Sequence, residues 1–272
     1  MRCLRLARRT SAEAPNSPMS TSFNLEKYIL HHMQDSRQWQ LPFLPPLQLP
    51  SFLSLHGLML IIAALFLVAL FCFVYDKKAR VPRRFTNLLE ALVIFIRDEI
   101  AIKSIGKEDG RRMTPFLCTM FFFILTLNLM GLIPLFATAT ANPNVTGALA
   151  FFTLCFMIFG TIYKNGFKGF QKAFIPAGVP KGILIILVPI EFLGLFIKTG
   201  ALMIRLFANM LAGHMVIFAM LGLVLLLGLV ALPSVLLAGC IGVLEVFIAF
   251  LQAYIFTLLT AVFIGQMYHP QH

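Results

Sequence analysis

Charged residues inside long apolar stretches are the first candidates for chemistry in this sequence. Those between positions 182 and 265 are Glu191, Lys198, Arg205 and Glu245. A charge near the middle of a bilayer costs about 2.5–3.5 kcal/mol on insertion scales, so such residues are rare and usually functional. Arg205 lies in the segment IRLFANMLAGH, and its guanidinium keeps its proton throughout the physiological range. Arg205 is therefore the residue that most needs an explanation.

Three of these charges recur every seven residues, which places Glu191, Lys198 and Arg205 along one slowly drifting face of a helix. The residues that share the face of Arg205 are small, namely Ala201, Ala208 and Ala212. Small side chains let a second helix approach closely in lipid, so Arg205 is expected to face a partner helix. A salt-bridged stripe that holds a bundle together is the structural alternative.

A second set of polar residues can exchange protons. His214 follows Arg205 by nine residues, which turns it about 180° away on a helix. Glu245, Gln252 and Gln266 are spaced by seven and fourteen and form a polar stripe of their own. Histidine and glutamate take up and release protons, whereas arginine does not. A fixed cation beside such groups suggests a proton path with a gate against leakage, although His214 alone would equally suit a hydrogen bond in helix packing.

Composition indicates the environment of these residues. Of 272 residues, 59% are hydrophobic and 12% are charged, against about 25% charged in soluble domains. The sequence therefore predicts an all-α polytopic membrane protein, and its net charge of +11 requires no nucleic acid. Four cysteines lie in apolar runs without CxxC or Cys/His spacing, which indicates neither a disulfide framework nor a metal site: Cys72, Cys118, Cys155 and Cys240.

Hydropathy predicts about five membrane crossings. Three spans of ordinary length are expected at 57–75, 115–136 and 147–163. The apolar stretches 182–232 and 234–267 are longer. As a single helix the first of these would measure about 75 Å, more than twice the bilayer core of about 30 Å. It must therefore fold back or lie steeply tilted.

Loop charges orient the spans. Residues 76–114 hold ten Lys and Arg, the loop with Lys164, Lys168, Lys172 and Lys181 is purely basic, and residues 137–146 carry no charge. The positive-inside rule predicts that both basic loops are cytoplasmic, with the N-terminus outside and the C-terminus inside. Within the first loop, FTNLLEALVIFIRDEI at 85–100 has a modest amphipathic pattern. It predicts a helix at the membrane surface or an ordinary solvated loop helix.

The organisation along the chain is an N-terminal extra-membrane segment at 1–52 and a membrane domain at 53–272. Residues 1–18 are rich in arginine and lack the apolar core of a secretory signal. They resemble an organellar transit peptide, or they precede a true start at Met19. The proline-rich LPFLPPLQLP at 41–50 cannot continue a helix.

The polar segments resemble signatures of subunit a of F-type ATP synthases, the stator protein that lines the rotating c-ring. IRLFANMLAGH and FLQAYIFTLLTAVFIG carry the resemblance most specifically. Other segments match in the same order, and together they cover nearly everything after Met19: YILHHM at 28–33, NLMGLIP at 128–134, FIPAGVP at 174–180 and PIEFLGLFIKTGALMIRLFANM at 189–210.

The resemblance implies a role for each polar residue. Arg205 matches the family's essential arginine, which faces the c-ring carboxylate and separates two aqueous half-channels. The outward half-channel corresponds to Asn209, His214, Glu245 and Gln252. Glu191 matches an acid of the cytoplasmic half-channel, and weaker matches are Lys198 and, at the outer entrance, Asn142 and Asn144.

Two departures from the pattern of some bacterial relatives accompany these matches. The acid and the histidine of the outward half-channel are exchanged between positions 214 and 245. Gly131 replaces an acid, so no proton role is assigned to that position.

The family further implies two long, strongly tilted helices packed against the c-ring, and a subunit without catalysis of its own. Its partners would be the c-ring, peripheral-stalk subunit b, other ATP synthase subunits and membrane lipid, without cofactor, metal or nucleic acid. A bacterial inner membrane is the simplest location. The coupling ion, H⁺ or Na⁺, is chosen chiefly by the ring and is not readable from this chain.

Two other classes of membrane protein can place charges inside a membrane. Secondary transporters have internal repeats with paired broken helices, and no repeat is seen in this sequence. Intramembrane proteases of the zinc or serine type would need an HExxH or a GxSxG motif, and neither occurs.

Overall fold

The structure is a computed structural model that describes residues 38–39, 47–48, 54–74, 84–133, 136–172, 181–228 and 232–269. The predictions for residues 1–18 and for the segments at 28–33 and 174–180 lie outside the described residues. Within them, β1 (Gln38–Trp39) pairs antiparallel with β2 (Leu47–Gln48). The fold is otherwise built from helices.

Each predicted span lies largely within a helix, although several helices extend beyond the predicted bounds. Their bounds are α2 (Leu55–Ala69), η1 (Leu70–Val74), α3 (Arg84–Phe95), η2 (Ile96–Ile102), α4 (Lys103–Ile105), α5 (Lys107–Leu132), η3 (Ala139–Ala141), α6 (Pro143–Lys172), α7 (Lys181–Leu227) and α8 (Leu232–Tyr268). Five of them, α2, α5, α6, α7 and α8, are long and apolar enough to cross a membrane. The predicted all-α fold with about five crossings is confirmed.

Helix α7 is a single helix of 47 residues, so of the two predicted alternatives the stretch does not fold back within it, and the steep tilt remains. At 1.5 Å per residue it is about 70 Å long, more than twice the bilayer core of about 30 Å. Pro189 lies inside it without ending it. In lipid a continuous helix is favoured because it satisfies its backbone groups internally. A helix of this length fits a membrane only when steeply inclined.

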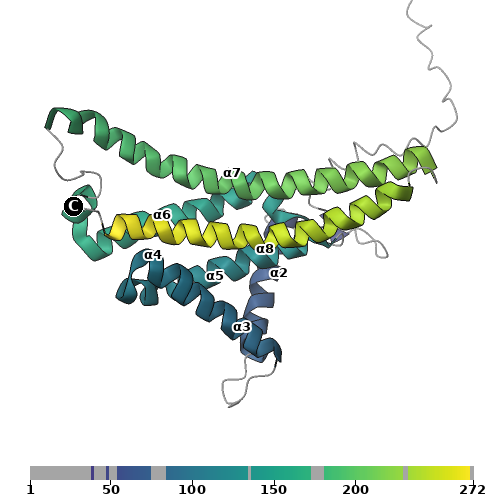
Figure 1. The fold of residues 1–272 in the computed structure, drawn as a ribbon, viewed down its shortest axis with the longest axis horizontal. Helices are drawn as coiled ribbons and strands as arrows, with labels where there is room; N and C mark the ends of the chain where they lie inside the picture. The colour runs from purple at the N-terminus through teal and green to yellow at the C-terminus, as the bar shows by residue number, and fades with distance from the viewer. Residues whose placement is uncertain are drawn as a thin grey trace, which may run out of the picture.

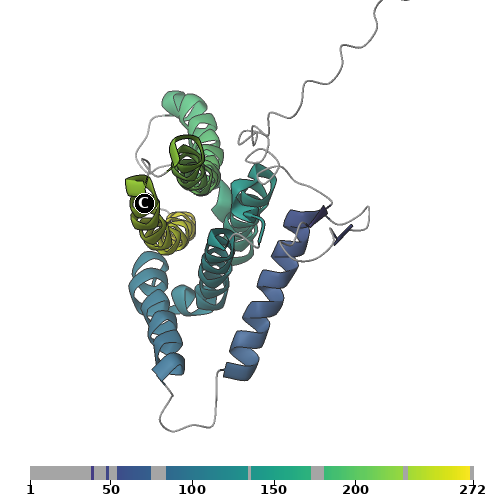
Figure 2. The same ribbon diagram turned by 90° about the vertical axis from the view of Figure 1, so that its right-hand side faces the viewer.

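Helices α7 and α8 run side by side along the longest dimension of the molecule, and α7 bows gently (Figure 1). Turned by 90°, the same two helices are seen nearly end-on, while α2 is seen along its length (Figure 2). Helix α2 therefore crosses the direction of α7 and α8. Ser54 caps α2 by accepting a hydrogen bond from the Gly57 amide at 3.2 Å.

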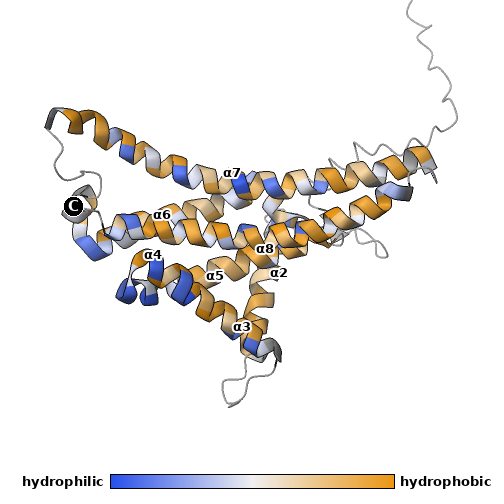
Figure 3. Ribbon diagram, viewed as in Figure 1, coloured by the Kyte–Doolittle hydropathy of each residue, from blue (hydrophilic) through white to orange (hydrophobic). Residues whose placement is uncertain are grey.

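The core lies where α5, α6, α7 and α8 meet. Phe121, Phe256, Ile124, Leu202 and Leu206 are completely buried there. Many large apolar side chains on the outer faces of α7 and α8 are exposed, and hydrophilic residues interrupt these helices only as isolated bands (Figure 3). An apolar exterior of this kind is suited to lipid or to another membrane helix.

The predicted amphipathic segment at 85–100 is helical, as α3 followed by the π-helix η2. Ile96 and Ile100 are buried, and η2 packs on α5. The exposed face keeps Leu88 and Ile94, which fits a helix at a membrane surface better than a solvated loop helix. The neighbouring Arg97–Asp98 hydrogen bonds, at 2.7 and 2.9 Å, raise the pKa of Arg97 and lower that of Asp98.

Gly265 allows α8 to approach α4 very closely. A Cβ atom at this position would lie only 2.9 Å from the carbonyl carbon of Ser104 and 3.4 Å from Cα of Ile105. Gly265→Ala must therefore push two backbones apart, and overpacking of this kind costs about 1–3 kcal/mol. We expect a lower thermal unfolding temperature for the purified assembly.

Gly242→Ala on the same helix is the control, because an added Cβ at position 242 meets nothing within 4 Å. It should not lower the unfolding temperature, since alanine favours helix over glycine. Equal destabilisation by the two variants would contradict the close packing of α8 on α4.

Candidate functional site

Helix α7 meets polar residues of α8 at three levels. Gly213 lies against Glu245, Asn209 against Gln252, and Lys198 against Gln266. The residue numbers fall along α7 as they rise along α8, so the two helices are antiparallel. This register brings together residues that the sequence could place only on separate stripes.

His214 is held at the first level by three oxygen atoms. Its Nδ1 lies 3.1 Å from the Met210 carbonyl oxygen, and its Nε2 lies 2.9 Å from the Gly131 carbonyl oxygen and 3.0 Å from Oγ1 of Thr138. Both carbonyl oxygens are acceptors, so protonated His214 can donate to both of them, whereas neutral His214 can donate to only one. The Thr138 hydroxyl is a further hydrogen-bond partner of Nε2.

Glu245 is only 7% exposed, and among the described residues neither carboxylate oxygen has a hydrogen-bond partner. It lies against Gly213, where an added Cβ atom would come 2.9 Å from its Cδ. His214 is the next residue on α7. A buried carboxyl group without a hydrogen-bond partner among the described residues is uncommon, which makes Glu245 a candidate functional residue.

Asn209 and Gln252 form the second level, where Nδ2 of Asn209 donates to Oε1 of Gln252 at 2.9 Å. Gln252 is buried, and Asn209 is exposed on α7. Asn128 of α5 is completely buried and donates from Nδ2 to the Ala249 carbonyl oxygen of α8 at 3.3 Å. The first two levels thus form one polar cluster, which we call the outer cluster: Asn128, Thr138, Asn209, His214, Glu245 and Gln252.

The predicted entrance residues lie where α6 begins. Asn142 caps α6, since its Oδ1 accepts from the Asn144 amide at 2.9 Å. Its Nδ2 lies 3.4 Å from Nδ1 of His56, which is buried on α2. Asn144 is exposed. Asn142 therefore has a structural function that would explain its presence without any role in transport.

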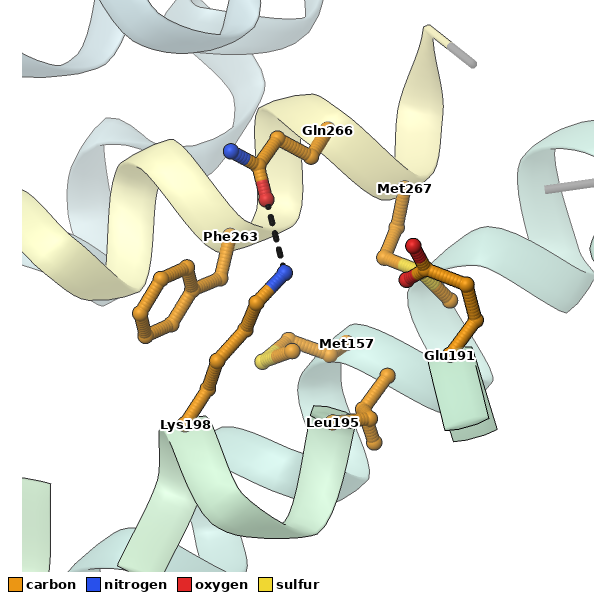
Figure 4. Close-up of a pocket in the computed structure, with 7 residues that line it drawn as sticks. All are labelled: Met157, Glu191, Leu195, Lys198, Phe263, Gln266 and Met267. Carbon is orange, nitrogen blue, oxygen red and sulfur yellow. Dashed lines mark hydrogen bonds between the residues drawn. The ribbon is translucent and has the colours of Figure 1, made fainter. Parts of the chain in front are cut away.

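The third level is a separate cluster, which we call the inner cluster. Lys198 donates from Nζ to Oε1 of Gln266 at 3.2 Å and lies 5.5 Å from the centroid of the Phe263 ring. Glu191 lines the other side of the same cavity, whose volume is about 70 Å³ (Figure 4). That volume accommodates one or two water molecules.

Arg205 lies between the two clusters along α7. In the part of the chain that the structure describes, its guanidinium makes no hydrogen bond and no ion pair. Glu191 and Lys198 likewise form no ion pair with any described residue. Ala201 and Ala208, which share the face of Arg205, are exposed. The salt-bridged stripe is therefore not found among the described residues, and an open face with an unpaired cation is found instead.

The two clusters are separated on α8 as well. From residue 253 to residue 265 the helix reads AYIFTLLTAVFIG, without a charged residue. Thr257 bonds back to the Ala253 carbonyl oxygen at 2.9 Å, so its hydroxyl is used within the helix. This uncharged segment, which includes the buried Thr257 and Thr260, lies opposite the turn of α7 that carries Arg205. The arrangement is two polar regions with an uncharged segment of α8 and one cation of α7 between them.

Sequence reasoning missed two members of the outer cluster. Thr138 lies just before η3 in an irregular segment, where no periodic pattern selects it. Asn128 is a polar residue in an apolar span, and that signal could have found it. In the described ranges no group of three or more His, Cys, Asp or Glu could hold a metal ion.

Comparison with known proteins gives consistent matches. The family model of the ATP synthase A chain matches residues 57–265. Proteins named ATP synthase subunit a are 50% identical over 77% of this chain in Anaeromyxobacter dehalogenans, 50% over 77% in Myxococcus xanthus and 44% over 89% in Chloroherpeton thalassium. These alignments cover 56%, 71% and 77% of the respective relatives. The chain thus aligns with little more than half the length of the Anaeromyxobacter protein.

Proposed function

Because the chain belongs to the ATP synthase A chain family, we propose that it conducts protons in the membrane sector of an F-type ATP synthase. It couples their flow to rotation of a c-ring and hence to ATP synthesis. Its five apolar helices make it a multi-pass membrane protein. The single observation that carries the proposal is the unpaired Arg205 on an open face of α7, between two polar clusters.

The outer cluster is the half-channel that opens outward. Protons pass Asn142 and Asn144 at the entrance and reach His214, whose ring nitrogens lie within hydrogen-bond distance of two carbonyl oxygens and the Thr138 hydroxyl. Glu245 lies beside Gly213 and takes the next position. Asn209 and Gln252 continue the polar lining toward the open face, where a ring carboxylate is loaded.

Arg205 keeps the two half-channels apart. A permanent cation repels a proton that would cross directly, and it attracts the ring carboxylate as that group passes. Two unit charges about 4 Å apart attract by roughly 4 kcal/mol at an effective dielectric constant of about 20. That energy is enough to favour the deprotonated carboxylate and small enough to release it when the ring turns.

The inner cluster is the half-channel that opens to the cytoplasm. The ring carboxylate releases its proton near Glu191, and the cavity between Glu191, Lys198 and Gln266 gives that proton access to water. Lys198 lies at the far side of the cavity from Glu191 (Figure 4). As a second cation it stabilises the ionised form of any nearby carboxylate, which favours release.

The remaining properties follow from this role. The chain performs no catalysis by itself and needs no cofactor. It assembles with the c-ring, peripheral-stalk subunit b and other ATP synthase subunits in a bacterial inner membrane. The N-terminus lies outside and the C-terminus lies in the cytoplasm.

Copurification tests the proposal against a secondary transporter. The chain, tagged and extracted in mild detergent, is expected to bring down a c-ring, because its exposed apolar α7 and α8 faces have no partner within the described chain. Reconstituted alone, the chain should not couple the movement of protons to the transport of any substrate. Substrate-driven transport by the isolated chain, without a ring, would support the transporter instead.

A further inference from the structure

A third group of titratable side chains lies outside both clusters. Asp109 of α5, Lys164 of α6 and His269, just after α8, meet at the end of the molecule where α4 and α6 lie beside the end of α8 (Figure 1). We call them the surface triad. Lys164 forms an ion pair with Asp109. Hydrophilic residues gather at this end (Figure 3).

His269 has a partner for each of its charge states. Its Nε2 lies 3.3 Å from Nζ of Lys164 and 3.5 Å from Oδ2 of Asp109. Neutral His269 accepts a hydrogen bond from the Lys164 ammonium, whereas protonated His269 is repelled by Lys164 and attracted by Asp109. The side chain is 59% exposed, so water reaches the imidazole ring.

The rest of the triad is fixed in place by its surroundings. The Lys164 ammonium lies 4.9 Å from the centroid of the Tyr268 ring, and Asn165 donates from Nδ2 to the Tyr268 carbonyl oxygen at 3.1 Å. The side chain of Asp109 is 19% exposed and that of Lys164 is 26% exposed. Among the described residues, the charged or titratable neighbours of His269 are thus Asp109 from α5, Lys164 from α6 and Tyr268 from α8.

The triad lies next to the inner cluster. The His269 amide bonds to the Gly265 carbonyl oxygen at 3.0 Å, so the helical turn continues through it. Gln266, which lines the inner cavity, precedes His269 by three residues, about 4.5 Å along the axis. Asp109 and Lys164 lie in the basic segments that the positive-inside rule predicts to be cytoplasmic. On the proposed function, the triad lies at the mouth of the inner half-channel.

We propose that His269, between Asp109 and Lys164, is a proton-exchanging residue that passes protons between the inner half-channel and the cytoplasmic water. This inference rests on the proposed function. When the assembly pumps protons at the expense of ATP, His269 takes a proton from water or buffer and returns to its neutral form by giving it to the channel. During synthesis the transfer runs in reverse, so no other reactant is needed.

Such a residue matters because free protons are scarce. At a proton concentration of about 10⁻⁸ M, a diffusional ceiling of about 10¹⁰ M⁻¹s⁻¹ delivers on the order of 10² protons per second to one site. Enzyme turnover numbers are about 1–10³ s⁻¹, so supply can limit pumping in weak buffer. A titratable group at the channel mouth enlarges the target for protons and holds each captured proton beside the channel, which raises the supply in weak buffer.

His269→Gln tests the proposal in the complete assembly, reconstituted in liposomes with its cytoplasmic side outward. Glutamine can still bond to Lys164 and Asp109, but it does not titrate. ATP-driven proton uptake is measured at mildly alkaline external pH, first in weak buffer and then with added imidazole. We expect a several-fold slower uptake in weak buffer and recovery to the wild-type rate with imidazole, which replaces the missing proton carrier.

The control is Asp98→Asn, which removes a carboxylate paired with Arg97 on η2 and should not slow uptake in weak buffer. An unchanged rate for His269→Gln in weak buffer would overturn the proposal. So would a slower rate that imidazole does not restore, since the triad would then only anchor α8. If the proposed function itself were wrong, the wild-type assembly would not pump at all, so the two failures are distinguishable.

Discussion

Arg205→Lys is expected to abolish proton-driven ATP synthesis while the chain still assembles with its partners. Lysine keeps the charge but replaces a planar head with five donors by a single flexible ammonium. An attraction of roughly 4 kcal/mol corresponds to about a thousandfold in equilibrium. That attraction requires the cation to stay about 4 Å from the ring carboxylate, and the flexible ammonium of lysine does not fix this distance, so synthesis should fall to background. The measurement is ATP synthesis in liposomes under an imposed proton gradient.

Arg111→Lys is the matched control, because Arg111 is an exposed arginine on the first turns of α5. It should leave synthesis close to the wild-type rate. Wild-type synthesis by Arg205→Lys would contradict the role given to the guanidinium head, because charge alone would then suffice.

Glu245→Gln is expected to lower proton-driven synthesis by about 10²–10⁴-fold, the range that a positioned acid or base contributes to proton transfer. The amide has nearly the shape of the carboxyl group, so the contact with Gly213 is kept. What is lost is the ability to bind and release a proton next to His214. The rate of synthesis and the rate of ATP-driven pumping should fall together.

Glu99→Gln serves as the control, since Glu99 is an exposed carboxylate that pairs with Lys103 on the same turn of helix. It should have no measurable effect on either rate. Glu245→Asp should keep part of the activity because it keeps a titrating group. Full activity of Glu245→Gln would mean that protons enter by another route.

The helices were predictable because apolar run length is a strong signal in a membrane protein. The residues at which the helices begin and end were not predictable in the same way. Helix α5 begins at Lys107, eight residues before the predicted span, because its polar first turns form good helix without being apolar. Helix α6 likewise continues to Lys172, past the predicted end at residue 163, with a change of backbone at Gly166 (φ 70°). Hydropathy predicts which residues lie within the membrane, whereas backbone hydrogen bonding determines where a helix begins and ends.

For the candidate site, the sequence predicted which residues share a helix face, but not which residues contact one another across two helices. Nine residues of separation correctly put His214 on the side of α7 away from Arg205: His214 contacts Gly131 and Thr138, while Ala208 beside Arg205 is exposed. That Asn209 meets Gln252, and Lys198 meets Gln266, depends on the register of two antiparallel helices. Spacing within one helix carries no information about that register. The roles of these residues in transport stay predictions.

The most direct test is a high-resolution structure of the assembled membrane sector with its ring. The proposed function predicts that the Arg205 guanidinium faces the c-ring at the depth of the ring carboxylate, within about 4 Å when that group stops beside it. It also predicts water on both sides of Arg205 and no continuous water path across it. A guanidinium held in a permanent ion pair inside the subunit, turned away from the ring, would contradict the central claim.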